Sequence, residues 1–266
     1  MRLISWNINV RKNCARHINA LSGRNPDIVV LQEVNPNCLS ELREKLPLIG
    51  LGNVVDNASL AAEFGRKHYY GLIASRWPIN SLSPEIFDIP FPDSVLSATI
   101  ASPKFNLEIH SAHIPPGSSQ GWTKIETFEG IYKYLTEYTH SPRILCGDFN
   151  SPQLELPDGQ ILTWGQTRKG KIRKSRGARW DAGERGVIQH LKNYDLPDVF
   201  RLLHGYEIQE YSIEMNHKGK ITRRRFDHVF ASKMLNPSSC QYLHEWREQG
   251  MSDHSPLEVD FSPMDK

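Results

Sequence analysis

The sequence has no long hydrophobic run, no internal repeat and no low-complexity linker across its 266 residues. A membrane-spanning helix needs roughly 18 consecutive apolar residues, and no stretch approaches that length. The chain opens directly on a strand-like segment, without the basic and apolar regions of a secretory signal. From these features we expect neither a membrane-spanning nor a secreted protein. We therefore expect one domain, residues 1–266, of a soluble intracellular (cytoplasmic) protein.

Cysteine and excess charge are both scarce. The four cysteines, Cys14, Cys38, Cys146 and Cys240, are scattered and form no C-x-x-C pair. This spacing is typical of reduced structural thiols and argues against a disulfide framework or a zinc site. The 32 basic residues nearly balance the 30 acidic ones, for a net charge of +2. Such a balance does not by itself indicate a nucleic-acid partner.

Short apolar runs separated by turn residues are abundant and predict many strands. We expect strands at 2–10, 28–31, 69–75, 95–101, 106–113, 143–149, 225–231 and 257–261. Helices are expected at 14–22, 40–46, 121–138 and 184–192, with a short helix after Asp195. A polar loop is expected from the strand at 143–149 up to about residue 183. The run at 28–31 is continuously apolar, as in a central strand covered on both faces. Because strands and helices do not alternate regularly, we expect an α/β domain with two packed sheets and outer helices, rather than a doubly wound parallel sheet.

One strand ends in a pair of polar residues. After the apolar run of 144–146 comes Gly147, followed by Asp148 and Asn150 two residues apart. On a strand this spacing places both side chains on one face. A carboxylate beside an amide can order a water, a metal ion and a phosphate oxygen together.

Other apolar runs end in the same way: they lead into Asn7 with Asn9, Glu33, His113, Asp227 with His228, and Asp253 with His254. A single carboxylate at a strand end is often only a turn or cap residue, but six such sets are not expected by chance. Carboxylates, amides and water are the ligands that hard divalent cations such as Mg²⁺ prefer. A metal held by few protein groups and completed by phosphate oxygens is the chemistry of phosphodiester hydrolysis.

Short motifs spread along the chain resemble those of a known family: Trp6-Asn7, Leu31-Gln32-Glu33, Gly147-Asp148-Phe149-Asn150, Arg225-Phe226-Asp227 and Ser252-Asp253-His254. Their order is similar to that of the endonuclease/exonuclease/phosphatase superfamily, and the chain looks most like its exonuclease III-like, abasic-site endonuclease branch. The resemblance spans Asn7 to His254. It implies a DNase I-like fold, a four-layered α/β sandwich of two packed mixed sheets flanked by helices, with the active site at one edge.

The resemblance also implies roles for the polar residues. Glu33 and Asn7 would be the main metal-side groups for Mg²⁺ or Mn²⁺, with Asp253 nearby. Asp148 would orient or deprotonate the attacking water, and Asn150 would position it. These roles agree with the ligand chemistry of hard cations.

Two histidines complete the implied site. His254, paired with Asp227, would face the scissile phosphate, because a carboxylate partner favours the charged imidazole that stabilises extra phosphate charge. His113 would contact the phosphate, at a position where the branch usually has tyrosine. His228 directly follows Asp227, so it points to the opposite side of that strand and is expected to be structural.

Two basic clusters predict the substrate class. Seven positive residues and no acidic one lie between residues 168 and 179, and a second cluster occupies 218–225. In a chain of nearly balanced charge, such clusters beside catalytic strands favour a polyanion over a merely solvated loop. The substrate-binding candidates are Asn9, Arg173, Lys174, Arg176, Arg179, Trp180 and Arg224. The Trp180 ring can either stack on a base or fill the core.

The chain departs from the branch where abasic-site enzymes line a small apolar pocket with aromatic residues. Arg224 stands at one such position, the upstream strand has Ser212-Ile213-Glu214, and Pro115-Pro116-Gly117 follows His113 where the branch often has asparagine. Phosphodiester hydrolysis is therefore expected, whereas specificity for abasic sites is not implied.

Our leading hypothesis is a metal-dependent DNA nuclease, either an exonuclease III-like exonuclease or an abasic-site endonuclease of DNA repair. We expect a monomer that acts on double-stranded DNA, without a membrane or an obligate protein partner. The alternative is a phosphoesterase of the same superfamily that acts on a small phosphate ester or a phospholipid headgroup, which His113 favours. A catalytically inactive nucleic-acid-binding module is disfavoured, because every catalytic position is chemically competent.

Overall fold

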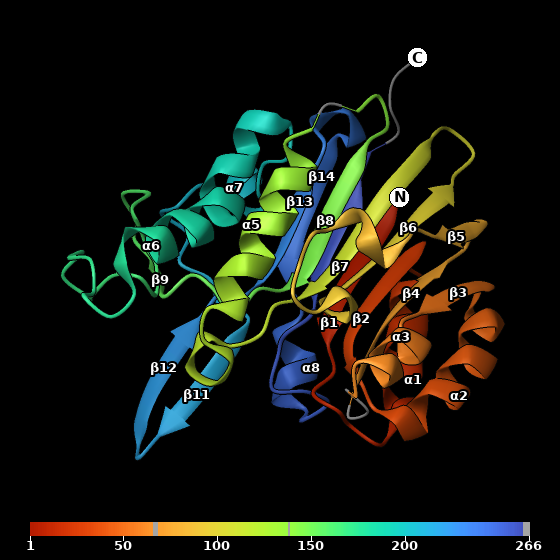
Figure 1. Ribbon diagram of the computed structural model, residues 1–266. Coiled ribbons are helices and arrows are strands. Elements are labelled where there is room, and N and C mark those ends of the chain that lie inside the picture. The colour runs from red at the N-terminus through yellow and green to blue at the C-terminus, as the bar shows by residue number, and fades with distance from the viewer. Residues whose placement is uncertain (66–68, 138, 263–266) are drawn as a thin grey trace.

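Two β-sheets packed face to face form the centre of the computed structural model, which describes residues 1–65, 69–137 and 139–262 (Figure 1). The first sheet has six strands in the order β14-β15-β1-β2-β4-β3. These strands are β1 (Arg2–Asn7), β2 (Ile28–Val34), β3 (Asn53–Asp56), β4 (Tyr70–Ser75), β14 (Pro237–Tyr242) and β15 (Leu257–Phe261). β1 and β2 run parallel, and the other pairs in this sheet are antiparallel.

The second sheet has five strands in the order β13-β8-β7-β6-β5, with β7 and β8 parallel and the other pairs antiparallel. They are β5 (Ile79–Ser81), β6 (Val95–Ala101), β7 (Asn106–His113), β8 (Arg143–Asp148) and β13 (Asp227–Ala231). Two ribbons lie outside the sheets: β9 (Leu154–Glu155) with β10 (Ile161–Leu162), and β11 (Ile213–His217) with β12 (Lys220–Arg224). The β11–β12 hairpin projects well beyond the sheets (Figure 1). Both large sheets are mixed, which excludes a doubly wound parallel sheet.

Side chains from both sheets meet in a core between them. In β2, Ile28 and Val30 join Ile144 of the second sheet in this core. Because successive strand residues face opposite sides, Val29 and Leu31 instead pack on the outer side, against helices. The strand is thus covered on both faces, as its continuous apolar run predicts.

Helices cover the outer face of each sheet. They are α1 (Cys14–Arg24), α2 (Pro36–Lys45), α3 (Ala58–Glu63), α4 (Gly117–Gln120), α5 (Thr123–Leu135), α6 (Gly177–Arg185), α7 (Val199–His204) and α8 (His244–Glu248). Short turns are η1 (Leu46–Ile49), η2 (Pro84–Ile86), η3 (Pro92–Ser94), the π-helical η4 (Gly186–His190), η5 (Leu191–Tyr194) and η6 (Lys233–Leu235). Residues of α1, α2 and α8 pack on the first sheet, and residues of α5 and α6 pack on the second. This arrangement confirms the four-layered α/β sandwich.

Most predicted strands and helices are present, and the differences fall in the polar segments. The polar loop expected up to residue 183 ends earlier, because α6 begins at Gly177 and buries Trp180. The helix expected at 184–192 is present as a continuous helical segment, formed by the end of α6, the π-helical η4 and the 3-10 helix η5. The helix expected at 121–138 spans Thr123–Leu135, and residue 138 lies outside the described residues. In the described part of the chain, no helix is long and apolar enough to cross a membrane.

The prediction of reduced thiols is wrong for one pair of cysteines. Cys14 on α1 and Cys38 on α2 form a disulfide, with Cα atoms 5.9 Å apart. Cys146 and Cys240 are free and buried, as expected for structural thiols. The bonded cysteines are 24 residues apart in sequence. Only the packing of α1 beside α2 on the first sheet brings them together.

Candidate active site

Polar strand ends from both sheets meet at one edge of the sandwich. In the second sheet, Asp148 is the register partner of His113 on β7 and of Asp227 on β13. In the first sheet, the parallel strands β1 and β2 deliver Asn7 and Glu33 to the facing edge. Register partners project from the same face of a sheet. Strand pairing therefore gathers residues that are far apart in the sequence.

Hydrogen bonds join the two sheets at this edge. The Asn7 Nδ2 donates to Glu33 Oε1 at 3.0 Å and to Asp148 Oδ2 at 3.1 Å. The His254 Nδ1 lies 2.7 Å from Asp227 Oδ2, and its Nε2 lies 3.9 Å from Asp148 Oδ2. The structure thus brings the central group of predicted residues into one connected cluster.

The turn after β8 has an unusual backbone. Gly147 has a φ of 132°, and a Cβ at this position would collide with the Ala112 carbonyl oxygen, so glycine is required. Asn150 does not share a strand face with Asp148 as expected, because β8 ends at Asp148 and Asn150 has a left-handed φ of 48°. Its backbone N–H donates to Asp148 Oδ1 at 2.8 Å, and its Nδ2 donates to the Ile114 carbonyl at 3.0 Å. A turn, and not a strand, holds the amide beside the carboxylate.

Glu33 is held in its ionised form. Burial opposes ionisation, but the hydrogen bond and charge of His113, together with the Asn7 amide, outweigh it and lower the pKa of Glu33 to about 2. The His113 Nε2 lies 3.3 Å from Glu33 Oε1. A carboxylate that stays ionised at this edge is suited to bind a cation.

His254 and Asp148 are perturbed in ways that suit acid–base chemistry. Burial lowers the pKa of His254, but the charges of Asp227 and Asp148 outweigh it and raise that pKa to about 10. Burial raises the pKa of Asp148, the His254 charge opposes this effect, and the Asp227 charge adds to it. The cluster therefore pairs a cationic imidazole with a carboxyl that accepts a proton more readily than an exposed aspartate.

Two overlapping sets of side chains have possible ligand atoms within 4.8 Å of one another: Glu33, His113 and Asp148, and Asp148, Asp227 and His254. Because the charged ring of His254 has no lone pair to offer a metal, its set can bind a cation only through the carboxylates. The Asp227 Oδ1 is buried without a hydrogen-bond partner among the described residues. An unsatisfied buried oxygen costs free energy, which a cation or its bound water would recover. Carboxylate-rich sets suit Mg²⁺ and Mn²⁺, so these residues fit a hard divalent cation.

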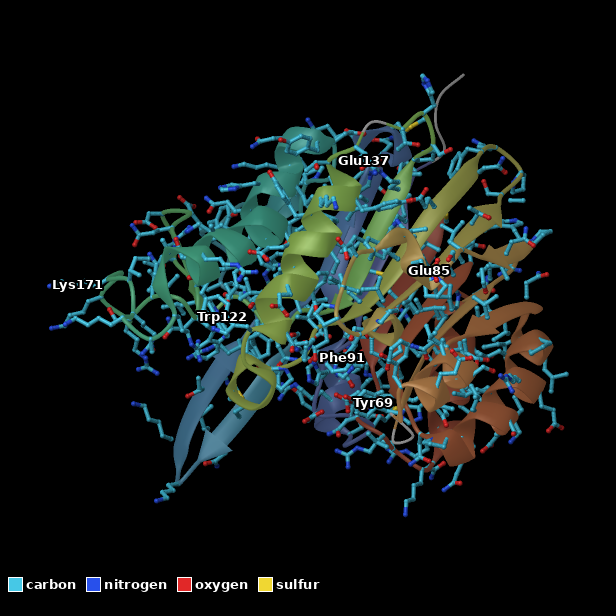
Figure 2. All side chains as sticks on the ribbon, viewed as in Figure 1. Tyr69, Glu85, Phe91, Trp122, Glu137 and Lys171 are labelled. Atoms are coloured by element: carbon cyan, nitrogen blue, oxygen red, sulfur yellow. A yellow bond between two sulfur atoms is a disulfide. The ribbon has the colours of Figure 1, made fainter. Side chains whose placement is uncertain are left out.

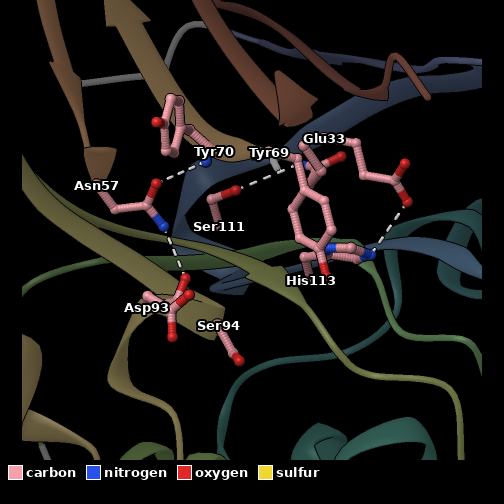
Figure 3. Close-up of a pocket in the computed structure, with 10 residues that line it drawn as sticks. Glu33, Asn57, Tyr69, Tyr70, Asp93, Ser94, Ser111 and His113 are labelled. Atoms are coloured by element: carbon pink, nitrogen blue, oxygen red, sulfur yellow. Dashed lines mark hydrogen bonds and ion pairs between the residues drawn. The ribbon is translucent and has the colours of Figure 1, made fainter. Parts of the chain in front are cut away.

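A small pocket of about 20 Å³ lies beside Glu33 and His113 (Figure 3). The Tyr69 ring meets His113 edge-on, with ring centroids 5.1 Å apart. One water needs about 10–15 Å³ of such space, so the pocket has room for a single water beside Glu33. Nothing in the local sequence marks Tyr69. It precedes β4, and only the antiparallel pairing of β4 with β2 brings it to this edge.

Three further predicted residues lie around this cluster. Asn9 is half-buried, and its N–H donates to Asn7 Oδ1 at 2.9 Å. Asp253, expected on the metal side, is exposed and belongs to neither set of metal-binding side chains. His228 is buried and hydrogen-bonded to Asp198, outside both sets, as expected for a structural residue.

The basic candidates near α6 differ in their surroundings. Arg173, Lys174 and Arg176 lie on the loop that precedes α6, where Figure 2 shows Lys171 projecting far from the sheets. Lys174 is exposed, and Arg176 lines a pocket together with Asn150. Arg179 and Trp180 lie within α6 itself.

Arg179 and Trp180 already bind other side chains of the protein. Arg179 pairs with Glu129 on the surface at 2.7 Å. Trp180 is only 3% exposed and donates to Glu184 at 2.6 Å. Of the two roles that the sequence left open for Trp180, the structure shows the core role and not base stacking, because the ring packs in the core against α5. Arg224 is half-buried on β12 and lines a separate pocket of about 250 Å³.

Two residues beside the site were not singled out by sequence. Lys124 and Trp164 both donate to the Asn150 carbonyl, at 2.6 and 2.9 Å. Lys124 lies four residues before Phe128 and seven before Ile131, so it shares the buried stripe of α5. A charged residue within an apolar helical stripe is a signal that sequence reasoning can use.

A family model agrees with this geometry. The model described as the Endonuclease/Exonuclease/phosphatase family matches residues 4–254. The chain belongs to this family. It is accordingly a hydrolytic enzyme that acts on phosphodiester bonds, in a family that depends on divalent metals, and its acidic and histidine cluster can bind one. No curated protein matches the sequence significantly.

Solved structures share the fold over the whole chain. An AP endonuclease from Archaeoglobus fulgidus is 20% identical with a TM-score of 0.73, and the match covers 99% of this chain and 100% of that one. The 3′-5′ exonuclease NExo from Neisseria meningitidis is 20% identical with a TM-score of 0.69, again over 99% and 100%. D. rerio TDP2 complexed with a single-strand DNA product is 16% identical with a TM-score of 0.68, over 99% of both chains. These similarities confirm the DNase I-like fold.

Proposed function

We propose that the protein is a Mg²⁺- or Mn²⁺-dependent DNA nuclease that hydrolyses phosphodiester bonds by direct attack of water. The observation that carries this proposal is the contact between the sheets, where Asn7 links Glu33 to Asp148. A metal-binding carboxylate, a buried base and the cationic imidazole of His254 then lie in one cluster. Together these three groups can activate water, hold a metal and stabilise the extra charge on a phosphate.

In this mechanism Asp148 takes a proton from the attacking water. Burial raises the pKa of Asp148, which suits a general base. Asn150 uses its Nδ2 to bind the Ile114 carbonyl, which leaves its side-chain oxygen to accept from the same water. Glu33, with Asn7 beside it, would hold the divalent cation, which neutralises charge on the phosphate when bound.

The two histidines act on the phosphate. Asp227 accepts a hydrogen bond from His254 Nδ1, which fixes the ring and keeps it charged, so that Nε2–H is free to donate to a phosphate oxygen. His113 is held against Glu33 and supplies a second imidazole on the other side of Asp148. The extra negative charge of the transition state therefore meets donors that are already in place.

DNA is the substrate that the relatives and the charge distribution favour. One structural relative is an AP endonuclease, and NExo and TDP2 have each been solved with a DNA product. A pocket lined by Asn150, Arg176 and Met215 joins the candidate centre to the basic loop before α6 and to the β11–β12 hairpin. Both segments project from the sheets (Figures 1 and 2), where they can contact the backbone of a polyanion.

The test is cleavage of labelled DNAs in Mg²⁺ and in EDTA, with intact, nicked and abasic duplexes and a single strand. We expect metal-dependent cleavage of at least one duplex and its loss in EDTA. No cleavage across the set, together with metal-dependent hydrolysis of a small phosphate ester, would contradict the nuclease and favour a phosphoesterase.

A further inference from the structure

Ser212 is a buried serine at the base of the β11–β12 hairpin, and the proposed mechanism gives it no role. It directly precedes β11, and its side chain is 0% exposed, although serine is usually a surface residue. Its backbone N–H donates to the Arg224 carbonyl at 2.8 Å, so it closes the hairpin where the two strands leave the sheets (Figure 1). A hydroxyl buried at this place needs hydrogen-bond partners, and they belong to the candidate active site.

The Ser212 side chain binds the segment that carries Asp227. Its Oγ accepts from the Phe226 N–H at 2.9 Å and from the Asp227 N–H at 3.1 Å. A hydroxyl oxygen has two lone pairs, so this single atom can accept from two successive N–H groups. Both contacts lie at the point where the chain leaves β12 and enters β13. They fix the backbone of Asp227, from which the carboxylate that binds His254 projects.

The Ser212 backbone binds the segment that carries His254. Its carbonyl accepts from the Ser255 N–H at 2.7 Å, and the next residue, Ile213, forms an antiparallel bridge with His254. Asp227 and His254 are 27 residues apart in the sequence. Ser212 therefore contacts both segments that carry this pair and sets the distance between them.

The Asp227 carboxylate depends on its backbone for its direction. Its Oδ2 lies 2.7 Å from His254 Nδ1, while its Oδ1 has no hydrogen-bond partner. Among the described residues, His254 is thus the only side chain that binds this carboxylate. A displacement of about 1 Å at reacting groups can cost about a hundredfold in rate. The place of the charged His254 ring therefore depends on the two segments that Ser212 joins.

We propose that Ser212 is a positioning residue for phosphodiester hydrolysis, which holds Asp227 and His254 at the separation that directs the imidazole to the phosphate. The inference rests on the proposed function, because it is there that His254 acts on the phosphate. Ser212 touches no reacting atom and acts only through Asp227 and His254. Its loss should therefore lower kcat, which depends on stabilisation of the transition state, and leave KM nearly unchanged.

The test compares Ser212→Ala with Ser212→Thr, which keeps the hydroxyl, and with Ser232→Ala. Ser232 is the matched control: it is 5% exposed, follows the far end of β13, and its Oγ accepts from the Arg143 N–H at 3.0 Å. Hydrolysis of bis(p-nitrophenyl) phosphate and of a labelled DNA duplex is measured in Mg²⁺. In Ser212→Ala we expect kcat to fall at least about tenfold, with KM within about twofold of the wild type. Ser212→Thr should recover most of the wild-type kcat, and Ser232→Ala should keep it.

Two further measurements separate positioning from stability. Urea titration should give lower midpoints for both alanine variants, because each leaves a buried N–H without its acceptor. In proton NMR, the His254 Nδ1–H that binds Asp227 should give a low-field signal, identified by its absence in His254→Gln. This signal should shift or disappear in Ser212→Ala and remain in Ser232→Ala.

Wild-type kcat in Ser212→Ala with an unchanged imidazole signal would overturn the inference, and so would an equal loss of kcat in Ser232→Ala. Failure of the nuclease proposal is a different result, in which the wild type hydrolyses the small diester but no DNA. The kcat values on the small diester then still decide the role of Ser212. If neither substrate is cleaved, the imidazole signal decides it.

Discussion

At the edge where the sheets meet, polar side chains hydrogen-bond to one another. The basic residues around this edge differ, since some are exposed and others form ion pairs. Asn7 binds both Glu33 and Asp148, at 3.0 and 3.1 Å, because strand register places all three together. On the periphery, Lys174 is exposed to solvent. Arg179 instead forms an ion pair with Glu129, with Nη2 2.7 Å from Oε2. Strand pairing therefore determines the positions of the central side chains, whereas individual ion pairs determine which peripheral cations remain available.

The run of three arginines at 223–225 shows the same contrast within one segment. Arg223 is exposed and pairs with Glu214 at 2.9 Å. Arg225 is fully buried and pairs with Glu155 at 2.7 Å and Asp198 at 2.8 Å. Counting positive residues therefore overstates the charge available to a polyanion, because Arg225 is a structural residue and Arg223 is partly neutralised.

The largest effect is expected at the centre. Asp148→Asn keeps the size of the side chain but removes its ability to take a proton, so Mg²⁺-dependent DNA cleavage should fall about 10³-fold while DNA binding is largely kept. Cleavage and binding are measured on the same labelled duplex. Asp158→Asn, at an exposed aspartate, is the control and should cleave like the wild type. Near-normal cleavage by Asp148→Asn would remove this residue from the mechanism.

The next effect separates buried from exposed arginines. Arg225→Met leaves two buried carboxylates, Glu155 and Asp198, without this partner, so the free energy of unfolding should drop by about 3–5 kcal/mol. Urea titration measures this change. Arg223→Met is the matched control in the same segment, and its unfolding midpoint should barely move. Similar midpoints for the two variants would mean that burial does not distinguish these arginines.

A pH effect follows from the same buried cluster. Burial would raise the pKa of Glu155, but the charges and hydrogen bonds of Arg225 and Arg201 outweigh it and lower that pKa from 4.5 to about 2. The unfolded chain then binds more protons between these values, so stability is present above about pH 4.5 and is lost as the pH falls toward 2. The shift corresponds to roughly 3 kcal/mol. Urea titrations from about pH 2 to 7 measure it.

Glu155→Gln should flatten this pH dependence, since the amide does not titrate. Glu129→Gln, at a glutamate on the surface, should leave the dependence as in the wild type. A wild-type slope in Glu155→Gln would assign the acid sensitivity to other carboxylates.

The smallest effect tests the periphery. Each phosphate that a cation neutralises contributes about 0.9 to the slope of log affinity against log salt. Lys174→Met should reduce the slope by about that amount, whereas Arg179→Met should reduce it by less than half as much, because Glu129 already neutralises Arg179. Fluorescence anisotropy of a labelled duplex at several salt concentrations measures both slopes. Equal slopes for the two variants would show that the Glu129 ion pair opens on DNA.

Local patterns predicted the parts of the site that depend on one strand at a time. Each apolar run that ends in Asn7, Glu33, His113 or Asp148 is visible in the sequence because a buried strand must stop where polar groups begin. The order of these motifs also carried the family resemblance, which the family model and the four-layered fold confirm. The prediction that Asp148 and Asn150 share one strand face was wrong, because the strand ends at Asp148 and a left-handed turn follows.

Features that depend on distant contacts were missed. The disulfide between Cys14 and Cys38 requires α1 and α2 to lie side by side. Tyr69 reaches His113 only through the pairing of β4 with β2. The burial of Trp180, which the sequence left as one of two alternatives, was decided only by the packing of α6 against α5. No local pattern predicts these contacts, because each joins residues that are far apart in the sequence and meet only after folding.

The sequence by itself determined the kind of chemistry, since carboxylates, amides and histidines at strand ends suit a hard cation and a phosphate whatever the exact packing. The tertiary structure decided which charges remain available. Arg225 and Arg179 form ion pairs with carboxylates, whereas Lys124 and Arg176 lie together beside Asn150 with Glu184 nearby but, among the described residues, no carboxylate within 4 Å. The physical reason is that the effect of a charge depends on its burial and its partners, and folding alone assigns both.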